Sequence, residues 1–120
     1  MRQVIDPSLE ALYSLKDRST TRETVYANLR RRSEAVRAQP DLICDIAYGP
    51  TPRERIDVFT QQGGAPVFVF VHGGYWRALE KDTFLALCAP FAARGFVSVN
   101  VDYGLRPEFT VLEIVEQVLR

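Results

Sequence analysis

The sequence contains few of the residues from which disulfide frameworks and metal centres are built. Its 120 residues include only one histidine, His72, and two cysteines, Cys44 and Cys88. The cysteines lie far apart in the chain and match no metal-ligand spacing. Reduced thiols of this kind are typical of a cytoplasmic protein, and we expect that location here.

An excess of charge of one sign and a long hydrophobic run are also missing. Fifteen basic and fifteen acidic residues cancel, so the net charge gives no reason to expect a nucleic acid or an anionic membrane as a partner. Residues 1–10 contain no apolar core of signal-peptide length, and no apolar run is long enough to span a bilayer. With 47% apolar and 25% charged residues, the chain has the composition of one small globular domain.

The most informative feature that is present is an apolar strand pattern followed by two glycines. Residues 67–71 alternate valine with phenylalanine, and His72-Gly73-Gly74 follows at once. The run predicts a strand buried on both faces. Paired glycines let backbone N–H groups approach a ligand closely, and in an acyl-transfer enzyme that ligand is the oxyanion of the tetrahedral intermediate. A plain tight turn is the alternative, but the position directly after the strand favours a functional loop.

The rest of the chain alternates between helix and strand patterns. The expected helices are 7–16, 21–38, 83–94 and 111–119, and the other expected strands are 42–48, 53–59 and 96–101. Thr20 and Thr110 each have a glutamate three residues on, which predicts two capping boxes. Asp82 is the expected N-cap of the third helix, Pro90 an expected kink and Gly95 its stop.

This order of elements predicts an α/β fold. Strand, helix, strand and helix following a hairpin favour a sheet with right-handed crossovers. The hairpin of 42–48 and 53–59 would then form an antiparallel edge on an otherwise parallel sheet.

The polar residues near the predicted loop have both structural and catalytic interpretations. His72 would need a nucleophile and an orienting carboxylate to act as a general base, so we favour a role in which its ring nitrogens anchor the loop. Asp102 follows the strand 96–101, at the edge where α/β sheets place their sites, and we favour structural support over an acid role. Tyr75 and Trp76 either line a substrate pocket or pack at its rim. Cys88 is most simply a core thiol.

Several of these blocks resemble a known family. Residues 55–59, 71–76, 81–82, 101–108 and 113–115 are similar to the N-terminal part of an α/β-hydrolase, in the branch of esterases whose third strand ends in His-Gly-Gly. The closer likeness is to the arylformamidases (kynurenine formamidases). The resemblance implies an incomplete α/β-hydrolase sheet, with strands in the order 1-2-4-3 and flanking helices.

The resemblance also implies a serine hydrolase that cleaves an ester or an N-formyl amide, with N-formylkynurenine as the leading substrate. It implies no metal and no other cofactor. The site residues that it places in this chain are the oxyanion-hole N–H groups of Gly73, Gly74 and Tyr75, their supports His72 and Asp102, and the substrate contacts Tyr75 and Trp76.

The family's catalytic triad has no match in the chain. No serine lies in a Gly-x-Ser-x-Gly motif and no histidine follows His72, so nucleophile, acid and base are absent. We therefore expect residues 1–40 to form a helical segment, and residues 41–120 to form the first part of a hydrolase domain truncated before the nucleophile elbow. Alone, it should be inactive. The loop also departs from the family at Gly104, where arginine is usual.

Two other functions stay open. The chain could be a non-catalytic module that binds a small acyl compound or pairs with a separate chain carrying the triad. A hydrolase that uses Cys44 or Cys88 with His72 is less favoured, because Cys88 falls on a predicted apolar helix. In either case, the order 1-2-4-3 leaves the strand 67–71 as a flat apolar edge, and we expect self-association through it.

Overall fold

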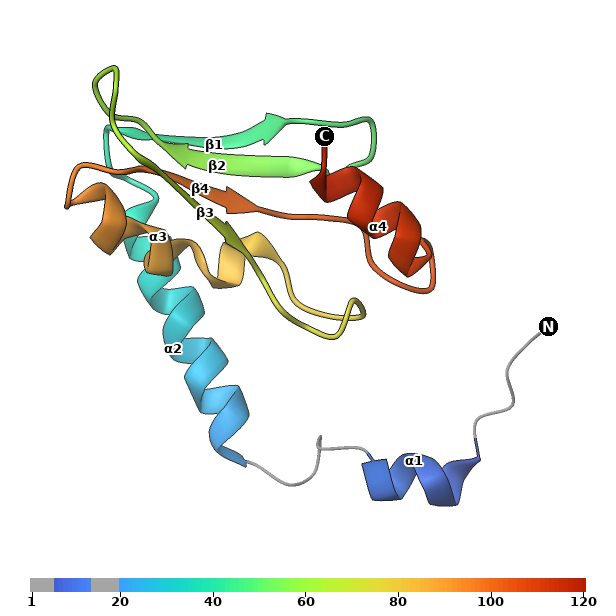
Figure 1. The fold of residues 1–120 in the computed structure, drawn as a ribbon. Coiled ribbons are helices and arrows are strands. Elements are labelled where there is room, and N and C mark those ends of the chain that lie inside the picture. Colours follow the sequence, from blue (N-terminus) through green and yellow to red (C-terminus); the bar gives the residue numbers. More distant parts are fainter. Residues whose placement is uncertain (1–5, 14–19) are drawn as a thin grey trace.

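The computed structural model of the chain describes residues 6–13 and 20–120. Figure 1 shows the arrangement of its helices and strands. In chain order these are α1 (Pro7–Tyr13), α2 (Thr20–Val36), β1 (Leu42–Ala47), β2 (Arg55–Phe59), β3 (Val67–Val71), the 3-10 turn η2 (Lys81–Thr83), α3 (Leu85–Ala92), β4 (Val97–Val101) and α4 (Val111–Val118). Within the described residues, no helix is long and apolar enough to cross a membrane.

The four strands form one mixed sheet in the predicted order β1-β2-β4-β3. β1 pairs with β2 and β2 with β4 in antiparallel fashion, whereas β3 and β4 are parallel. The crossover between the parallel strands runs through η2 and α3. Each strand begins or ends no more than two residues inside its predicted range. The predicted α/β class and strand order are therefore confirmed.

The C-terminal part of α2 packs against α3 and η2, and α3 covers one face of the sheet (Figure 1). The core between them contains Phe59 of β2 and three residues of α3, Leu85, Cys88 and Ala92. The two phenylalanines of β3 pack against this cluster. Cys88 is fully buried there, so it is the core thiol that the sequence predicts.

Helix α2 packs through its C-terminal half. Val36 packs against the core and Ser33 is buried, whereas Val25 is 49% exposed. The Ser33 hydroxyl donates to the carbonyl of Thr83 at 3.1 Å and accepts from the N–H of Ala86 at 3.0 Å. These bonds tie α2 to the segment around η2, and an apolar periodicity carries no signal for them.

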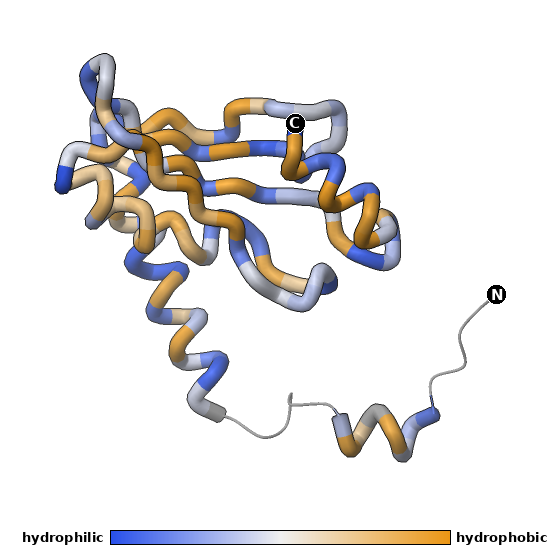
Figure 2. Tube along the Cα trace, viewed as in Figure 1, coloured by the Kyte–Doolittle hydropathy of each residue, from blue (hydrophilic) through white to orange (hydrophobic). Residues whose placement is uncertain are grey.

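Only one face of β3 is covered, which corrects the prediction of a strand buried on both faces. Val67, Val69 and Val71 are 62%, 55% and 44% exposed, because alternate side chains point away from the α2 and α3 side of the sheet. Figure 2 shows the continuous hydrophobic trace of β3 at the sheet's edge. The sequence shows that the strand is apolar, but it does not show which helices or strands cover each of its faces.

The helix predicted after Asp82 begins later than expected. Asp82 lies inside η2, and α3 begins at Leu85 with no side-chain cap on Phe84. The Asp82 carboxylate instead binds Lys81 at 2.8 Å and Arg37 at 2.7 Å. The prediction of Asp82 as an N-cap is therefore wrong, and its Oδ1 binds two cations instead.

Other helix signals are confirmed. The Thr110 hydroxyl accepts from the N–H of Glu113 at 3.3 Å, and the Glu113 carboxylate accepts from the N–H of Thr110 at 2.7 Å, which completes a capping box. Gly95, with a φ of 86°, follows the last turn after α3. The Thr20 side chain and residues 14–16 of the first predicted helix lie outside the described part of the chain.

Candidate active site

The loop that follows β3 borders a cavity at one end of the sheet. The cavity has a volume of about 480 Å³ and is lined by residues 71–76, by Tyr103 and by the apolar side chains of α4. Because β3 and β4 are parallel, their C-terminal ends meet at the same edge. This edge therefore brings the loop after β3 together with the residues after β4.

In this loop the carbonyl groups are engaged, whereas the N–H groups are free. The Tyr103 hydroxyl donates to the His72 carbonyl. The Gly73 carbonyl lies 2.7 Å from Nδ1 of His72, and the Gly74 carbonyl accepts an N–H from three residues further on at 3.1 Å. None of the N–H groups of residues 73–75 donates to another residue in the described ranges.

The engaged carbonyls determine where the free N–H groups point. In a trans peptide the C=O and the N–H point in opposite directions. The carbonyls of residues 72–74 each accept a hydrogen bond. The N–H of the following residue, which belongs to the same peptide, therefore points away from the donor of that bond. Three successive N–H groups without a protein acceptor can together receive a negatively charged oxygen.

Glycine is required at one of the two positions in the loop. Gly74 has a φ of 131°, and a Cβ built on it would lie 2.0 Å from the Ala78 carbonyl oxygen. A Cβ on Gly73 would meet nothing within 4 Å. Tyr75 and Trp76 both have a φ of 56°, so the backbone stays left-handed past the glycines. The loop therefore has one indispensable glycine and one replaceable glycine.

His72 is the buried anchor of the loop. It is 2% exposed, and its ring stacks on that of Tyr103 with the centroids 4.4 Å apart. Nε2 lies 2.8 Å from Oδ1 of Asp102, and Nδ1 faces the Gly73 carbonyl. Both ring nitrogens are engaged, so neither is free to exchange a proton with a molecule in the cavity.

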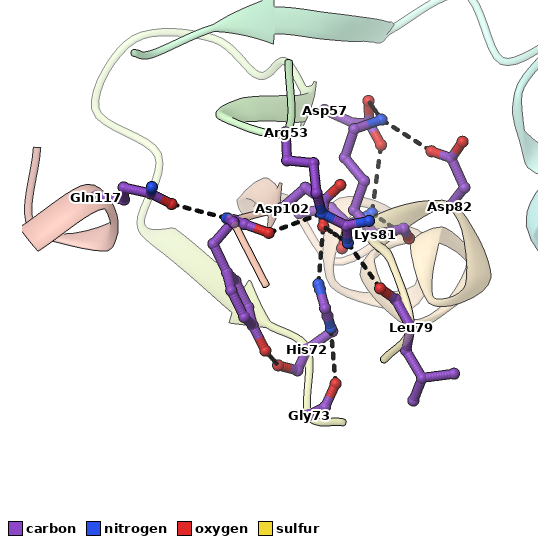
Figure 3. A network of polar contacts seen from close by, with 12 residues as sticks. Arg53, Asp57, His72, Gly73, Leu79, Lys81, Asp82, Asp102 and Gln117 are labelled. Atoms are coloured by element: carbon purple, nitrogen blue, oxygen red, sulfur yellow. Dashed lines mark hydrogen bonds and ion pairs between the residues drawn. The ribbon is translucent and has the colours of Figure 1, made fainter. Parts of the chain in front are cut away.

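Asp102 connects His72 to an arginine of the β1–β2 turn (Figure 3). Its Oδ1 accepts from Nη2 of Arg53 at 2.8 Å, in addition to its contact with the imidazole. The same guanidinium donates to the carbonyl of Leu79 at 2.7 Å and to that of Tyr103 at 2.8 Å. Arg53 thereby joins the loop after β3 to the loop after β4.

Two tyrosines hold the backbone of this network as hydroxyl donors. Tyr48 donates to the Asp102 carbonyl at 2.6 Å, and Tyr103 donates to the His72 carbonyl. Burial raises the pKa of Tyr48 to about 12 and also raises the pKa of Tyr103. Both hydroxyls therefore keep their protons at neutral pH and remain donors.

A second ionic cluster fixes the segment that follows the loop. Nζ of Lys81 lies 2.7 Å from Asp45, 2.8 Å from Asp57 and 2.8 Å from Asp82. Burial lowers the pKa of Lys81, but its hydrogen bonds to the three carboxylates raise it overall above its usual value. The cluster holds η2 against β1 and β2. Across residues 6–13 and 20–120, no group of three or more His, Cys, Asp or Glu side chains could hold a metal ion.

Proteins with similar sequences include formamidases and esterases. The chain is 32% identical over 95 residues to the kynurenine formamidase of Danio rerio, which covers 77% of this chain and 32% of that protein. It is 35% identical over 75 residues to the kynurenine formamidase of Drosophila melanogaster, which covers 60% of this chain and 25% of that protein. Esterase LipC of Mycobacterium tuberculosis is 33% identical over 70 residues, which cover 52% of this chain and 17% of that protein. No family model matches the chain.

Solved structures with the same arrangement of strands and helices identify the fold. A proposed thioesterase from Silicibacter sp. TM1040 matches with a TM-score of 0.78 and 29% identity, over 92% of this chain and 43% of that chain. The chain has the α/β-hydrolase fold. Esterase B from Lactobacillus rhamnosis shares the fold at 16% identity, with a TM-score of 0.63 over 95% of this chain and 38% of its own. The predicted resemblance to arylformamidase-like esterases and the incomplete α/β-hydrolase sheet are confirmed.

This α/β-hydrolase chain spans about a third of the length of the fish kynurenine formamidases that it matches. Of its predicted site residues, Gly73, Gly74, Tyr75 and Trp76 lie together along the cavity. His72 and Asp102 are bonded to each other behind the loop. Their functional roles stay predictions.

Sequence analysis missed four residues that hold this site together: Arg53, Tyr48, Tyr103 and, in the second cluster, Lys81. Arg53 reaches a carbonyl 50 positions away, and Lys81 binds a carboxylate 24 positions away. No local spacing links such residues. Tyr103 alone had a signal, because it directly follows Asp102 at the end of a strand.

The two cysteines of the α/β-hydrolase chain are poorly suited to nucleophilic attack. Burial raises the pKa of Cys88 to about 12 and raises the pKa of Cys44 as well. A thiol must be ionised to attack a carbonyl. The thiols are therefore protonated at neutral pH, which argues against the cysteine hydrolase alternative.

Proposed function

We propose that this chain supplies the oxyanion-binding part of a serine hydrolase that cleaves esters or N-formyl amides. The observation that carries the proposal is the loop of residues 72–75, where protein donors hold successive carbonyls and three successive N–H groups are free. The similarity to proteins named kynurenine formamidase and esterase supports the reaction class. N-formylkynurenine is the leading candidate substrate.

In this mechanism a serine hydroxyl attacks the carbonyl carbon of the formyl or ester group, and the carbonyl oxygen becomes negatively charged. The N–H groups of Gly73, Gly74 and Tyr75 bind that oxygen more strongly in the transition state than in the substrate. One such donor contributes about 3 kcal/mol. A histidine that accompanies the serine takes its proton and delivers it to the leaving amine or alkoxide.

The 120 residues of the chain do not supply that serine or that histidine. They contain no Gly-x-Ser-x-Gly motif, and the one histidine, His72, is engaged in holding the loop. We therefore propose that the nucleophile and base come from elsewhere and that the chain by itself does not turn over substrate.

The cavity suits the acyl or aromatic part of such a substrate. Tyr75 is 79% exposed and Trp76 is 43% exposed, and their ring centroids are 5.6 Å apart. Apolar residues of α4 also line the cavity. An aromatic group of the substrate placed among these side chains would leave its carbonyl oxygen next to the loop.

Binding of a carboxylate tests the site without requiring turnover. In the nitrogen-15-labelled chain, benzoate should shift the amide signals of Gly73, Gly74 and Tyr75 with one saturable midpoint, because its carboxylate stands in for the charged oxygen. Gly63 and Gly64, in the turn between β2 and β3, are internal controls. Benzamide is the neutral control ligand. Equal shifts at the control glycines, or the same response to benzamide, would contradict the site.

Turnover tests the reaction class. The segment of the Danio rerio enzyme that matches this chain should be replaceable by the chain's own residues, with hydrolysis of N-formylkynurenine and 4-nitrophenyl acetate retained. The 120-residue chain alone should give no rate above background. A chimera that melts cooperatively and binds benzoate, yet hydrolyses neither compound, would contradict the catalytic proposal and favour the non-catalytic binding module.

We also propose that the edge of β3 pairs with a second copy of the chain. The two edges of the sheet differ. β1 carries a bulge between Ile43 and Ile46, where Asp45 has a φ of 60°, and a bulge protects an edge from pairing. β3 has a regular register, and residues 61–76 contain no Asp, Glu, Lys or Arg. A second copy would therefore meet no repelling charge along this edge.

Val69→Lys should shift the chain toward the monomer and raise the dissociation constant of the dimer at least about tenfold, because the substitution brings two like charges together across the contact. Ile43→Lys on the opposite edge is the matched control, since Ile43 is 51% exposed and Val69 is 55% exposed. Sedimentation over a range of concentrations measures both. A wild-type chain that sediments as a monodisperse monomer would rule out the pairing.

A further inference from the structure

Arg53 lies where one side chain can hold both loops of the proposed oxyanion site. It belongs to the β1–β2 turn, 26 residues before Leu79 and 49 before Asp102. Figure 3 shows its guanidinium directed at both residues. Nη2 donates to the Leu79 carbonyl and to Oδ1 of Asp102, while Nε donates to the Tyr103 carbonyl. Because the guanidinium is a rigid fork, each of these bonds constrains the others.

These bonds lead to the free N–H groups through a short path. Oδ1 of Asp102 also contacts Nε2 of His72, whose Nδ1 faces the Gly73 carbonyl. That carbonyl belongs to the peptide whose N–H is on Gly74. The direction of the Gly74 N–H therefore depends on the guanidinium, through one carboxylate and one imidazole.

The position next to Tyr103 leaves no room for another cation. A Cβ on Gly104 would lie 2.4 and 2.7 Å from ring carbons of Phe109 and 2.9 Å from Oε1 of Gln117. The same Gln117 oxygen accepts from the Gly104 N–H at 2.7 Å. The space beside this glycine is filled, and the only cationic side chain bound to Asp102 besides the imidazole, among the described residues, comes from the hairpin.

We propose that Arg53 is a positioning residue of the oxyanion site, which holds the segments after β3 and β4 together from the β1–β2 turn. This inference rests on the proposed function. Arg53 also neutralises Asp102, whose side chain is 10% exposed. Without the guanidinium, a largely buried carboxylate would lie behind a loop that has to attract an anion. Loss of Arg53 thus weakens anion binding through both geometry and charge.

The test compares benzoate binding by Arg53→Ala, Arg53→Lys and Arg55→Ala. Arg55 is the matched control, because its Nη1 donates to the carbonyls of Thr51 and Glu54 within the hairpin and not to either loop. Arg53→Ala should weaken binding about tenfold. Arg53→Lys keeps the charge but not the fork, so the loss should be about threefold. Arg55→Ala should bind as the wild type does.

A second measurement needs no ligand. His72 is the only histidine, so its imidazole nitrogen signals are unambiguous. Arg53→Ala should move these signals and the Gly74 amide signal, while Arg55→Ala should not; if Arg53→Ala fails to fold, Arg53→Lys carries the comparison. Unmoved imidazole and Gly74 signals, or an equal loss of benzoate binding in Arg53→Ala and Arg55→Ala, overturn the proposal. A wild-type chain that does not bind benzoate contradicts the proposed function, and the imidazole signals then still decide whether Arg53 positions the loop.

Discussion

Gly74→Ala is expected to abolish anion binding by the loop, whereas Gly73→Ala is expected to preserve it. A methyl group at position 74 would meet the Ala78 carbonyl oxygen at 2.0 Å, in a residue whose φ is 131°. The backbone must move to remove that clash, and the N–H groups of residues 73–75 move with it. Loss of even one oxyanion donor lowers kcat about 100-fold or more, so the Danio rerio chimera with Gly74→Ala should lose at least that much.

The two glycines are adjacent, so the comparison separates a conformational requirement from the loss of flexibility in general. A Cβ on Gly73 meets nothing within 4 Å, and Gly73→Ala should change the free energy of unfolding by less than about 0.5 kcal/mol. Benzoate titration and chimera kinetics measure the two variants side by side. Equal losses in both would mean that the cavity tolerates no added methyl group, and wild-type binding by Gly74→Ala would mean that the loop is not the anion site.

The loop could be predicted because its signal is local. A strand of alternating valine and phenylalanine that ends in two glycines is a pattern of adjacent residues, and backbone sterics alone link it to a tight, ligand-facing turn. The capping box of Thr110 and the stop at Gly95 are local in the same sense. Strand order is not local, and its prediction came from the resemblance to a family rather than from the residues.

The pairings in the network behind the loop could not be predicted, because they join residues that the fold brings together. Arg53, Asp102 and His72 come from three separate segments, and each is compatible with an exposed position when its own segment is considered alone. Asp82 shows the opposite error, since its spacing to the helix suits an N-cap, but its Oδ1 binds a neighbouring lysine and a distant arginine. The exposed valines of β3 show that burial depends on partners, not on composition.

The Lys81 cluster is expected to give the largest stability effect in the chain. Lys81→Met removes the cation beside Asp57, whose side chain is fully buried, and leaves that carboxylate with the Asn100 amide at 3.3 Å and the Asp45 N–H at 3.0 Å. Breaking a buried ion pair from one side costs about 3 to 5 kcal/mol. The free energy of unfolding of a small domain is only about 5 to 15 kcal/mol. Denaturant titration should therefore show that Lys81→Met has lost a large part of it.

Two further variants show whether the loss of stability in Lys81→Met comes from the unpaired carboxylate of Asp57. Arg32→Met, on the exposed side of α2, removes one cation from the surface and should leave stability almost unchanged. Lys81→Met combined with Asp57→Leu replaces the buried pair by apolar groups and should recover most of the loss, because the uncompensated charge is gone. A double variant no more stable than Lys81→Met would show that lost packing, not charge, sets the cost.

Acid unfolding gives the same cluster an independent signature. Burial raises the pKa of Asp82, but the hydrogen bond and charge of Lys81, with the charge of Arg37, lower it below its ordinary value of 3.8. Ionised Asp82 therefore stabilises the folded state at pH values above 3.8, and this contribution is lost as the pH falls through the lower pKa that Asp82 has in the folded state. In Lys81→Met the contribution of Lys81 to this lowering disappears, so the acid midpoint should move to higher pH, while Arg32→Met should unfold at the wild-type midpoint. An unshifted midpoint in Lys81→Met would mean that Arg37 alone sets the ionisation of Asp82, and that the ion cluster is two independent pairs rather than one unit.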